Sequence, residues 1–487
     1  MTGALLLLLV IAPALAVLGC LVARPGQAAT LNLAAGVVVF AAAVPLTMLS
    51  RGGPYRYWGG YIVFDAIGAW VVLCAASVYL LSSIYAVGYM RLLGEDQRLP
   101  SFYALYAGFA LAILISPLMN NAALYWIAIE LTTLVSTFLV AFERAPESIE
   151  AAWKYIVIVS TGISLALLGT VLFYWNASFV LGPTYNMTWD ALHHAAPSMN
   201  PTLTVLAFLL VLVGYGTKVG LAPMHTWLPD AHSESPAPVS AMLSGALLNA
   251  AMLGIVRYLA IAERAPSGAL PRLALVALGA LSLLVAALFI VRQRGIKRLM
   301  AYSSVEHMGV MALGFGFGGP FGVAGALYHM LNHSLNKSLM FFGAGNMMRA
   351  YGTKEIGQIR AVARRFPVQA ALWLAGAVAI TGAPPFGLFL SELVVLRAGF
   401  QRSFAWAAGL MAGLLIVIFI GFLDHFRAMY FAPQDDEVGA AELRSPGAWC
   451  IAPMWLALAP LVVFGLWWPQ PLWDFFAHTA RLLSSAP

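Results

Sequence analysis

The stretch Gly214–Asn249, GYGTKVGLAPMHTWLPDAHSESPAPVSAMLSGALLN, decides how this chain is organised. A long apolar segment enters it carrying Lys218 where the hydrocarbon of a bilayer would lie, and Gly220 and Pro223 then interrupt the helix. A lysine in hydrocarbon costs about 2.5–3.5 kcal/mol on insertion scales unless it faces protein or water. Broken helices at membrane depth are tolerated where they are buried in protein or line a cavity. The stretch therefore predicts part of an ion path, and a purely structural kink is the alternative.

The composition places the chain in a membrane. Of its 487 residues, 61% are hydrophobic and 9% are charged, whereas soluble domains have about 25% charged residues. The net charge of +6 is explained by arginines in loops that set the topology, so a lipid bilayer and not nucleic acid is the expected partner. Cys20, Cys74 and Cys450 show no CxxC or Cys/His spacing. They give no case for a disulfide framework or an iron–sulfur cluster.

Fourteen apolar windows are long enough to span a bilayer as helices of about 20 residues. They lie near residues 3–22, 29–50, 66–90, 103–119, 121–142, 155–176, 203–233, 237–262, 271–291, 299–317, 320–349, 369–397, 403–430 and 450–471. The first window resembles a signal peptide but lacks a positive n-region, so we expect it to be the first helix. The longest polar connections, near 177–200 and 432–448, are too short for a soluble domain. We therefore predict one all-α polytopic membrane domain over residues 1–487.

The distribution of Lys and Arg predicts the orientation of the chain. Sixteen of the 26 lie in loops after odd-numbered spans and eight on the opposite side, with Lys218 and Lys337 inside the membrane. Cytoplasmic loops carry the excess of positive charge. We therefore expect both termini to lie outside the cytoplasm, in the inner membrane of a prokaryotic cell.

A second interrupted helix lies in ITGAPPFGLFLSE, where Gly382, Pro384 and Pro385 precede Glu392. The two interrupted spans, the seventh and the twelfth, are five apart. Matched breaks in two halves indicate inverted repeats with a transport site between them. The predicted division is an N-terminal unit of three helices (1–100), a first inverted repeat of helices 4–8 (101–265), a second of helices 9–13 (270–430) and a C-terminal helix (449–487).

Glu130, in NNAALYWIAIELTTLVSTF, lies near the middle of the fifth span. Burial disfavours the charged form of a carboxylate or a lysine, whereas pairing with the opposite charge favours it. If Glu130 pairs with Lys218, the lysine would release its proton more readily when the two side chains move apart and would keep it when they come together. The alternative is a static buried ion pair, which would contribute little stability.

The eleventh span, ALYHMLNHSLNKSLMFF, carries His329, His333 and Lys337 at i, i+4 and i+8. These positions share one helix face and cover about 12 Å of its length. With the neighbouring asparagines and serines they predict a hydrated stripe that can pass protons between imidazoles. The alternatives are haem or metal ligation by the histidine pair, and histidines that are simply satisfied inside the bundle.

Four further polar residues are candidates for a proton path. His225 and His232 lie next to the first break. They either lie at the mouth of a proton entry path or only stabilise the structure of the break. Glu306 and His307, in AYSSVEHMG, lie either on a path or at a solvated helix end. Neither HxxxH nor HExxH spacing occurs around the first break, so the sequence predicts no metal site.

Four motifs together resemble one known family. They are HTWLPDAHSESPAPVSAMLSG (225–245), KRLMAYSSVEHMG (297–309), HMLNHSLNKSLMFF (329–342) and GAPPFGLFLSE (382–392). They are similar to the antiporter-like membrane subunits of respiratory complex I, multisubunit cation/proton antiporters and energy-converting hydrogenases. The resemblance covers roughly residues 100–430. Within the family, SSVEHMG and PPFGLFLSE look most like the hydrogenase-4 F-type subunit of formate hydrogenlyases.

The resemblance implies a fourteen-helix core with two inverted five-helix repeats and a polar axis along the membrane midplane. It also implies a proton-transfer series that matches, in this sequence, Glu130, Lys218, His329, His333, Lys337 and Glu392. One position departs from the pattern: Asn249 stands where many relatives have a lysine or histidine that links the halves. Asparagine cannot take up a proton at physiological pH, so water or a neighbouring histidine would have to bridge the halves.

We expect a proton-translocating, or Na⁺-translocating, subunit of a redox-driven membrane complex of the hydrogenase, formate hydrogenlyase or NADH-quinone oxidoreductase-like type. The resemblance implies no cofactor in this chain. Partner subunits would include other antiporter-like membrane subunits and a peripheral redox arm with iron–sulfur clusters and a nickel–iron or other redox centre. Two alternatives stay open. One is a subunit of a redox-independent cation/proton antiporter or inorganic-carbon uptake complex, and the other is a structural scaffold with a degenerate channel.

Overall fold

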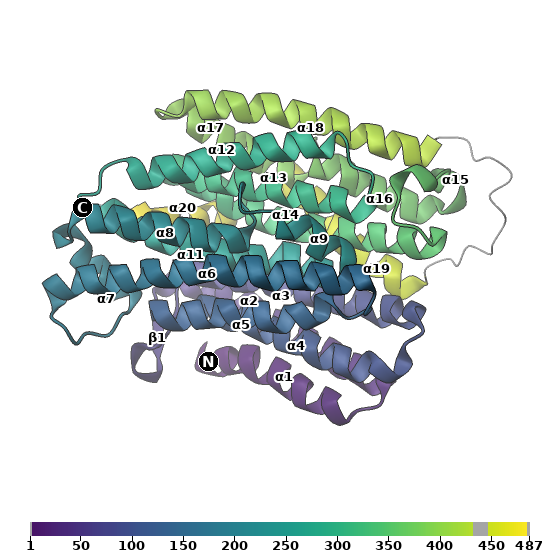
Figure 1. The fold of residues 1–487 in the computed structure, drawn as a ribbon, viewed down its shortest axis with the longest axis horizontal. Coiled ribbons are helices and arrows are strands. Elements are labelled where there is room, and N and C mark those ends of the chain that lie inside the picture. The colour runs from purple at the N-terminus through teal and green to yellow at the C-terminus, as the bar shows by residue number, and fades with distance from the viewer. Residues whose placement is uncertain (1, 432–446, 485–487) are drawn as a thin grey trace.

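The computed structural model describes residues 2–431 and 447–484, and these fold into helices that lie side by side along one axis of the molecule (Figure 1). Arg444, one of the arginines counted for topology, and residues 485–487 of the predicted C-terminal helix lie outside the described residues. Two short strands, β1 (Tyr55–Tyr57) and β2 (Ile62–Phe64), pair antiparallel between the second and third helices.

The α-helices of the described residues follow one another in a bundle with short connections. In chain order they are α1 (Thr2–Val22), α2 (Pro25–Leu49), α3 (Ala66–Tyr89), α4 (Leu99–Ile115), α5 (Ala122–Val140), α6 (Pro146–Leu181), α7 (Trp189–Ala195), α8 (Pro201–Val219), α9 (Trp227–Glu234), α10 (Ala237–Met242), α11 (Leu248–Arg264), α12 (Leu270–Ile290), α13 (Ile296–Phe317), α14 (Gly319–Tyr351), α15 (Val362–Arg365), α16 (Pro367–Ile380), α17 (Gly387–Gln401), α18 (Ala405–Phe431), α19 (Ala448–Leu466) and α20 (Gln470–Ser484). A π-helical turn, η7 (Leu243–Leu247), joins α10 to α11.

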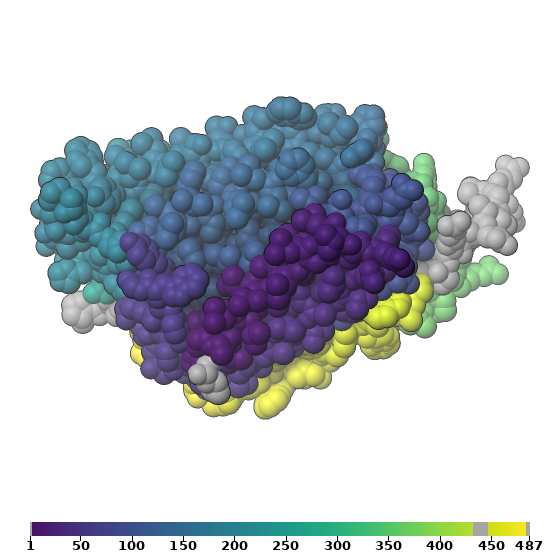
Figure 2. All heavy atoms as spheres, turned by 90° about the horizontal axis from the view of Figure 1, so that it is seen from below, coloured from purple at the N-terminus to yellow at the C-terminus, as the bar shows by residue number. Residues whose placement is uncertain are grey.

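The interior of the bundle is built from α3, α10, η7, α11, α13 and α14, whose residues are almost all buried. Helix α14 contacts α3, α13, α17 and α19 and lies within this interior. The outer helices instead expose large apolar side chains such as Leu15, Trp153 and Ile420. Figure 2 shows α1 and α2 (purple) across one outer face, with the C-terminal helices (yellow) along its edge. Such apolar outer faces suit contact with lipid.

Eleven helices in the described part of the chain are long and apolar enough to cross a membrane. The other three predicted spans correspond to α13 and α14, which carry many polar side chains, and to the interrupted pair α16 and α17. The total of fourteen spans, the two inverted repeats and the limits of the predicted units stay predictions.

Both predicted helix interruptions are confirmed. Helix α8 ends at Val219, and Gly220 follows in the left-handed region with φ +79°. A Cβ on Gly220 would meet Cδ1 of Leu228, so a larger residue there would have to displace that side chain as well as adopt the left-handed conformation. Between α16 and α17, Gly382 is also left-handed, with φ +65°. Glycine adopts this conformation without the steric cost that a Cβ would add.

The segment predicted as one C-terminal helix (449–487) forms two helices, α19 and α20. The backbone of Trp467 is extended after the last turn of α19, and Pro469 disfavours helical geometry at the residue before it. Helix α20 then packs on α14 and α3. The ring of Phe476 lies 4.8 Å from that of Trp70 on α3.

Candidate functional site

Lys218 lies in the last turn of α8 and is fully buried. Its Nζ donates hydrogen bonds to Thr133 Oγ1 on α5 at 2.8 Å and to Tyr155 OH on α6 at 2.9 Å. It also lies 5.1 Å from the centre of the Tyr155 ring, within the range of a cation–π interaction. Hydroxyl groups and an aromatic face thus replace part of the hydration that the ammonium group loses on burial.

Glu130 on α5 is joined to Lys218 through a hydroxyl group. Thr133 Oγ1, which accepts from Lys218, donates to Glu130 Oε2 at 3.1 Å, and Ser160 Oγ donates to Glu130 Oε1 at 2.6 Å. Lys218 is fully buried, whereas Glu130 is only partly buried. The expected partnership is therefore present, but as a chain of three groups and not as a direct ion pair.

Asn249, the departure from the family pattern, contacts α14 beside the π-turn. Its Nδ2 donates to Ser334 Oγ at 2.9 Å and to Gly245 O at 3.1 Å. His333, the residue before Ser334, contacts Ser244 O through Nε2 at 3.3 Å. No hydrogen bond between described residues joins this group directly to Lys218 or its partners. Hydrogen bonds therefore hold Asn249 against α14, and His333 is the ionisable residue next to it.

Lys337 on α14 is fully buried and contacts α13. Its Nζ donates to Met300 O at 3.1 Å and to Ser303 Oγ. Glu306, one turn further along α13, is 1% exposed, and both of its carboxylate oxygens lack a hydrogen-bond partner among the described residues. The structure thus places Glu306 in the interior, and the interpretation as a solvated helix end is wrong.

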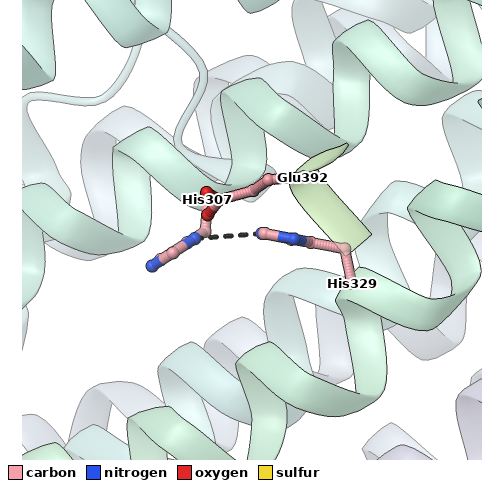
Figure 3. Close-up of side chains that lie close together, drawn as sticks. All are labelled: His307, His329 and Glu392. Carbon is pink, nitrogen blue, oxygen red and sulfur yellow. Dashed lines mark hydrogen bonds between the residues drawn. The ribbon is translucent and has the colours of Figure 1, made fainter. Parts of the chain in front are cut away.

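His307 and His329 form a directly hydrogen-bonded pair between α13 and α14 (Figure 3). His307 Nδ1 and His329 Nε2 are 2.9 Å apart, and His329 Nδ1 is 2.9 Å from Ser391 Oγ on α17. The Ser391 hydroxyl donates to Leu388 O, so its oxygen accepts from His329 Nδ1–H. A neutral imidazole has one donor and one acceptor nitrogen. His329 Nε2 therefore accepts from His307 Nδ1–H, which leaves His307 Nε2 as an acceptor.

Glu392 on α17 lies beside this histidine pair and is 4% exposed (Figure 3). Its Oε1 has no hydrogen-bond partner among the described residues. The carboxylate fits against the second helix break, because a Cβ on Gly382 would lie 1.9 Å from Glu392 Oε2. The break therefore provides the space that the Glu392 side chain occupies. His307, His329 and Glu392 come together from three helices, whereas the sequence pattern aligned only residues of α14.

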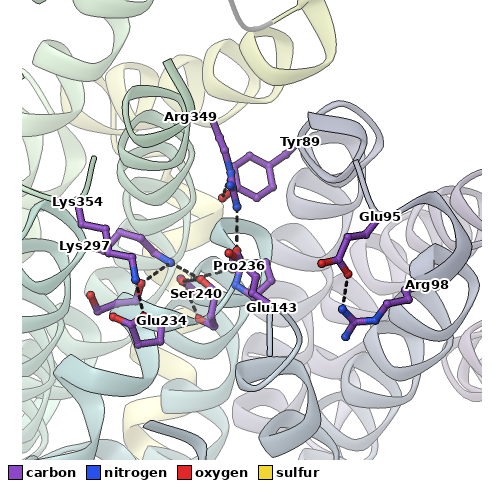
Figure 4. A network of polar contacts seen from close by, with 12 residues as sticks. Tyr89, Glu95, Arg98, Glu143, Glu234, Pro236, Ser240, Lys297, Arg349 and Lys354 are labelled. Atoms are coloured by element: carbon purple, nitrogen blue, oxygen red, sulfur yellow. Dashed lines mark hydrogen bonds and ion pairs between the residues drawn. The ribbon is translucent and has the colours of Figure 1, made fainter. Parts of the chain in front are cut away.

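A polar cavity of about 390 Å³ opens where the end of α9, the start of α13 and the end of α14 meet. Two ion pairs lie at this cavity (Figure 4). Arg349 pairs with Glu143 at 2.8 Å, and Lys354 pairs with Glu234 at 2.5 Å. Lys297 also lines it, yet is 2% exposed. Its Nζ donates to Ser233 O at 3.2 Å and to Ser235 O at the end of α9. A cation at the C-terminal end of a helix is favourably placed.

The two histidines near the first break differ in their surroundings. His232 is fully buried, and neither of its ring nitrogens has a partner among the described residues. Its ring stacks between those of Trp227 and Phe341, whose centres are 6.4 and 5.3 Å away. His225 lies before α9 against Tyr302, with ring centres 6.1 Å apart. Neither histidine forms a direct hydrogen bond with Lys218 or Lys337 within the described structure.

Several residues of the site are not apparent from the sequence. Three hydroxyl residues look like ordinary helix residues in the sequence: Thr133, Tyr155 and Ser160. They form hydrogen bonds with Lys218 or Glu130 only because α5, α6 and α8 pack together. The topology count treats Arg257 as a loop residue, but it lies in α11 and forms a bidentate ion pair with Asp65, with distances of 2.8 and 3.0 Å. The only feature of the sequence that points to a buried role for Arg257 is its position just inside the boundary of a predicted span.

Comparisons with known proteins show the family and the fold of this chain. The family model described as "NADH:quinone oxidoreductase/Mrp antiporter, TM" matches residues 119–418, which include every predicted site residue. The hydrogenase-4 component F homolog of Methylacidiphilum infernorum (isolate V4) is 35% identical over 431 residues, 87% of this chain and 89% of that protein.

Two solved structures share the fold. A chain of the Mrp complex from Dietzia sp. DQ12-45-1b superposes with a TM-score of 0.88 at 21% identity, covering 99% of this chain and 98% of that chain. A chain of respiratory complex I from Thermus thermophilus with bound aureothin gives a TM-score of 0.75 at 26% identity, covering 96% and 97%. The resemblance inferred from the motifs is confirmed. The chain is a multi-pass, antiporter-like membrane subunit and belongs to the NADH:quinone oxidoreductase/Mrp antiporter transmembrane family.

Proposed function

We propose that this subunit moves protons through its membrane interior along two polar paths, driven by redox chemistry in partner subunits. The observation that carries the proposal is the chain from Lys218 through Thr133 to Glu130. A fully buried lysine is costly in a membrane interior, and in this subunit it is hydrogen-bonded to a group that leads outward to a partly exposed carboxylate. A static structural lysine would also need hydrogen-bond partners, so the continuation of the chain from Thr133 to Glu130 is the part that supports proton transfer.

In the first path, Lys218 holds the proton and Thr133 reverses its hydrogen bonds to pass one on. A threonine hydroxyl is both a donor and an acceptor. When Lys218 gives a proton to Thr133 Oγ1, the hydroxyl gives its own proton to Glu130. The net result is one proton moved from the ammonium group to the carboxylate, with Thr133 unchanged except for its orientation.

In the second path, the proton enters the histidine pair at His307 Nε2, the nitrogen that has no partner among the described residues. His307 then gives its Nδ1 proton to His329 Nε2, and His329 can give its Nδ1 proton toward Ser391. For the transfer to balance, the Ser391 hydroxyl turns from Leu388 O and gives its own proton to the carboxylate of Glu392, the next residue of α17. Lys337 supplies the proton from the same face of α14, and the contact between the rings of His307 and His333, with centres 5.2 Å apart, supports a link toward Asn249.

The cavity at Lys297 is the proposed cytoplasmic entry. Its charged walls suit water, and Ser233 and Glu234, which line it, follow His232 directly in α9. We assign His232 and His225 to the route from this cavity to the helix break. The excess of Lys and Arg in the loops at this end supports the assignment to the cytoplasm of a prokaryotic cell, with both termini on the opposite side.

The hydrogenase type of complex is the partner that we propose. The support is the 35% identity to the hydrogenase-4 component F homolog over most of both chains. Other antiporter-like membrane subunits would flank this chain. A peripheral arm would carry the iron–sulfur clusters and the nickel–iron or other redox centre. This chain would contribute no redox centre and would act only on protons.

A redox-independent cation/proton antiporter is the second candidate. It is favoured by the TM-score of 0.88 with a chain of the Mrp complex, although at 21% identity this likeness concerns the fold. Identification of the co-purifying subunits separates the two candidates. Hydrogenase and iron–sulfur subunits are expected; a set of small membrane subunits without redox centres would favour the antiporter.

The experiment that tests the proposal is Lys218→Ala in the purified complex, reconstituted in liposomes. Redox turnover and proton movement are measured together. We expect proton movement per turnover to fall at least about tenfold, because the group that holds the proton is removed. The matched control is Lys154→Ala, which removes an exposed lysine of α6 and leaves the ratio unchanged. Proton movement at the normal ratio in Lys218→Ala would refute the role of Lys218.

A further inference from the structure

Three metal-binding side chains meet in the interior of the second half. His307 from α13, His329 from α14 and Glu392 from α17 each offer one ligand atom, and these atoms all lie within 4.8 Å of one another (Figure 3). All three side chains are buried. The arrangement is not a sequence motif, because it is assembled from three different helices.

Two atoms of this cluster have no hydrogen-bond partner among the described residues. They are Glu392 Oε1 and His307 Nε2. Buried polar atoms are usually paired, and an unpaired one calls for an explanation such as an ion or a catalytic role. The proposed proton path explains His307 Nε2 as the entry point, but it leaves Glu392 Oε1 without a partner.

The donor set selects one class of cation. Two imidazole nitrogens with one carboxylate oxygen is a ligand set of Zn²⁺ sites, with ligand distances of about 2.0–2.2 Å. Tetrahedral ligands at this distance are roughly 3.3–3.5 Å apart. The His307 and His329 nitrogens are 2.9 Å apart and face each other. To complete three ligands, the two rings must separate slightly and turn toward a common point, and the Glu392 side chain must rotate toward them. Carboxylate, carbonyl and water oxygens suit Mg²⁺ and Ca²⁺ better, and the two imidazoles therefore disfavour those ions.

We propose that His307, His329 and Glu392 bind a divalent transition-metal ion of the Zn²⁺ type, and that the bound ion stops proton passage along the second path. The ion takes the place of the proton that the two imidazoles share. His307 frees its Nδ1 by moving that proton to Nε2, so the ring stays neutral and no oxidation or reduction occurs. The blocking step rests on the proposed proton-translocating function, whereas the binding step does not.

Binding is tested on the purified full-length chain, by titration with ZnCl₂ and by X-ray absorption at the zinc edge. We expect one tight site with nitrogen and oxygen ligands. His329→Gln and Glu392→Gln are each expected to weaken binding by at least roughly tenfold. His478→Asn, which removes a histidine of α20 outside the cluster, is the matched control and leaves the affinity unchanged.

Two results would overturn the metal site. One is unchanged affinity in both cluster variants, which would place the ion at surface histidines. The other is a zinc spectrum without imidazole ligands. If one variant fails to fold, as judged by gel filtration, the other variant and the spectrum of the unaltered chain still decide the matter.

The blocking step is tested separately, in the reconstituted complex. We expect Zn²⁺ to reduce the number of protons moved per redox turnover. In Glu392→Gln, the same fractional reduction of the remaining proton movement should require at least roughly tenfold more Zn²⁺. Tight binding without any effect on proton movement would reject the block and leave the metal site standing. A normal proton ratio in Lys218→Ala would instead reject the proposed function, so the two failures are distinguishable.

Discussion

Gly382→Ala tests whether the second helix break exists to seat Glu392. Gly382 has φ +65°, and a Cβ there would lie 1.9 Å from Glu392 Oε2 and 2.8 Å from Glu392 Cδ. The left-handed conformation costs a residue with a Cβ about 1–2 kcal/mol. Overpacking of a buried site costs about 1–3 kcal/mol more. We expect the free energy of unfolding to fall by about 2–5 kcal/mol, and the Glu392 carboxylate to be displaced from the histidine pair.

Gly268→Ala is the matched control for the backbone contribution. Gly268 has φ +68°, and a Cβ there would meet no heavy atom within 4 Å. Its replacement should therefore cost about 1–2 kcal/mol, which is the cost of the left-handed conformation alone. The difference between the two variants, about 1–3 kcal/mol, isolates the contact with Glu392.

The free energies of unfolding are measured by denaturant titration in mixed micelles, and proton movement in proteoliposomes. The double variant Gly382→Ala with Glu392→Ala completes a thermodynamic cycle, and there the cost of Gly382→Ala should approach that of Gly268→Ala. Equal costs for Gly382→Ala and Gly268→Ala in the otherwise unaltered chain would show that the break does not constrain Glu392. Normal proton movement in Gly382→Ala would show that the position of this carboxylate does not matter.

Three further predictions concern other parts of the molecule. Thr133→Val removes the hydroxyl that joins Lys218 to Glu130, so proton movement per turnover should fall about tenfold or more. The control is Thr137→Val, which removes a hydroxyl that bonds to its own helix and should change proton movement little. Equal proton movement in the two variants would contradict the role of Thr133. Lys297→Met removes the donor to two backbone carbonyls at the end of α9 and should lower the thermal midpoint and slow proton uptake at the cavity; unchanged uptake would exclude this entry. The pKa of His193 is lowered from 6.5 to about 4, mainly by burial and further by two nearby guanidinium groups. As the pH falls, the unfolded chain therefore binds the proton before the folded chain does, and the free energy of unfolding should fall between pH 6.5 and pH 4 by up to about 3 kcal/mol. His193→Phe should flatten this dependence of the free energy of unfolding on pH. An unchanged dependence would rule out His193 as its source.

The sequence predicts the membrane fold and the helix breaks because these depend on local features. Gly220 and Gly382 with their neighbouring prolines interrupt apolar runs, and the structure has a break at each. The stripe on α14 follows in the same way from the spacing of His329, His333 and Lys337 along one helix.

The contacts between helices could not be predicted from spacing. Nothing in the sequence around Thr133 or Tyr155 distinguishes them from other hydroxyl residues of apolar helices. The approach of His307 to Glu392 depends on how α13, α14 and α17 pack. The topology count treats Lys297 as a loop cation, since a lysine at a helix start is usually solvated; its burial results from the carbonyl groups at the end of α9.

The π-turn η7 cannot be predicted from the apolar pattern either, and it has a consequence for how this subunit can change. A π-turn holds one residue more than the α-turn that it replaces, so it takes up one residue while the helix beyond it keeps its facing. In an uninterrupted α-helix the same extra residue would turn α11 by about 100° and move Asn249 away from α14. Deleting one residue of η7 should therefore close it to an α-turn and leave Asn249 against α14, so this connection can lose one residue without exchanging the group that meets α14.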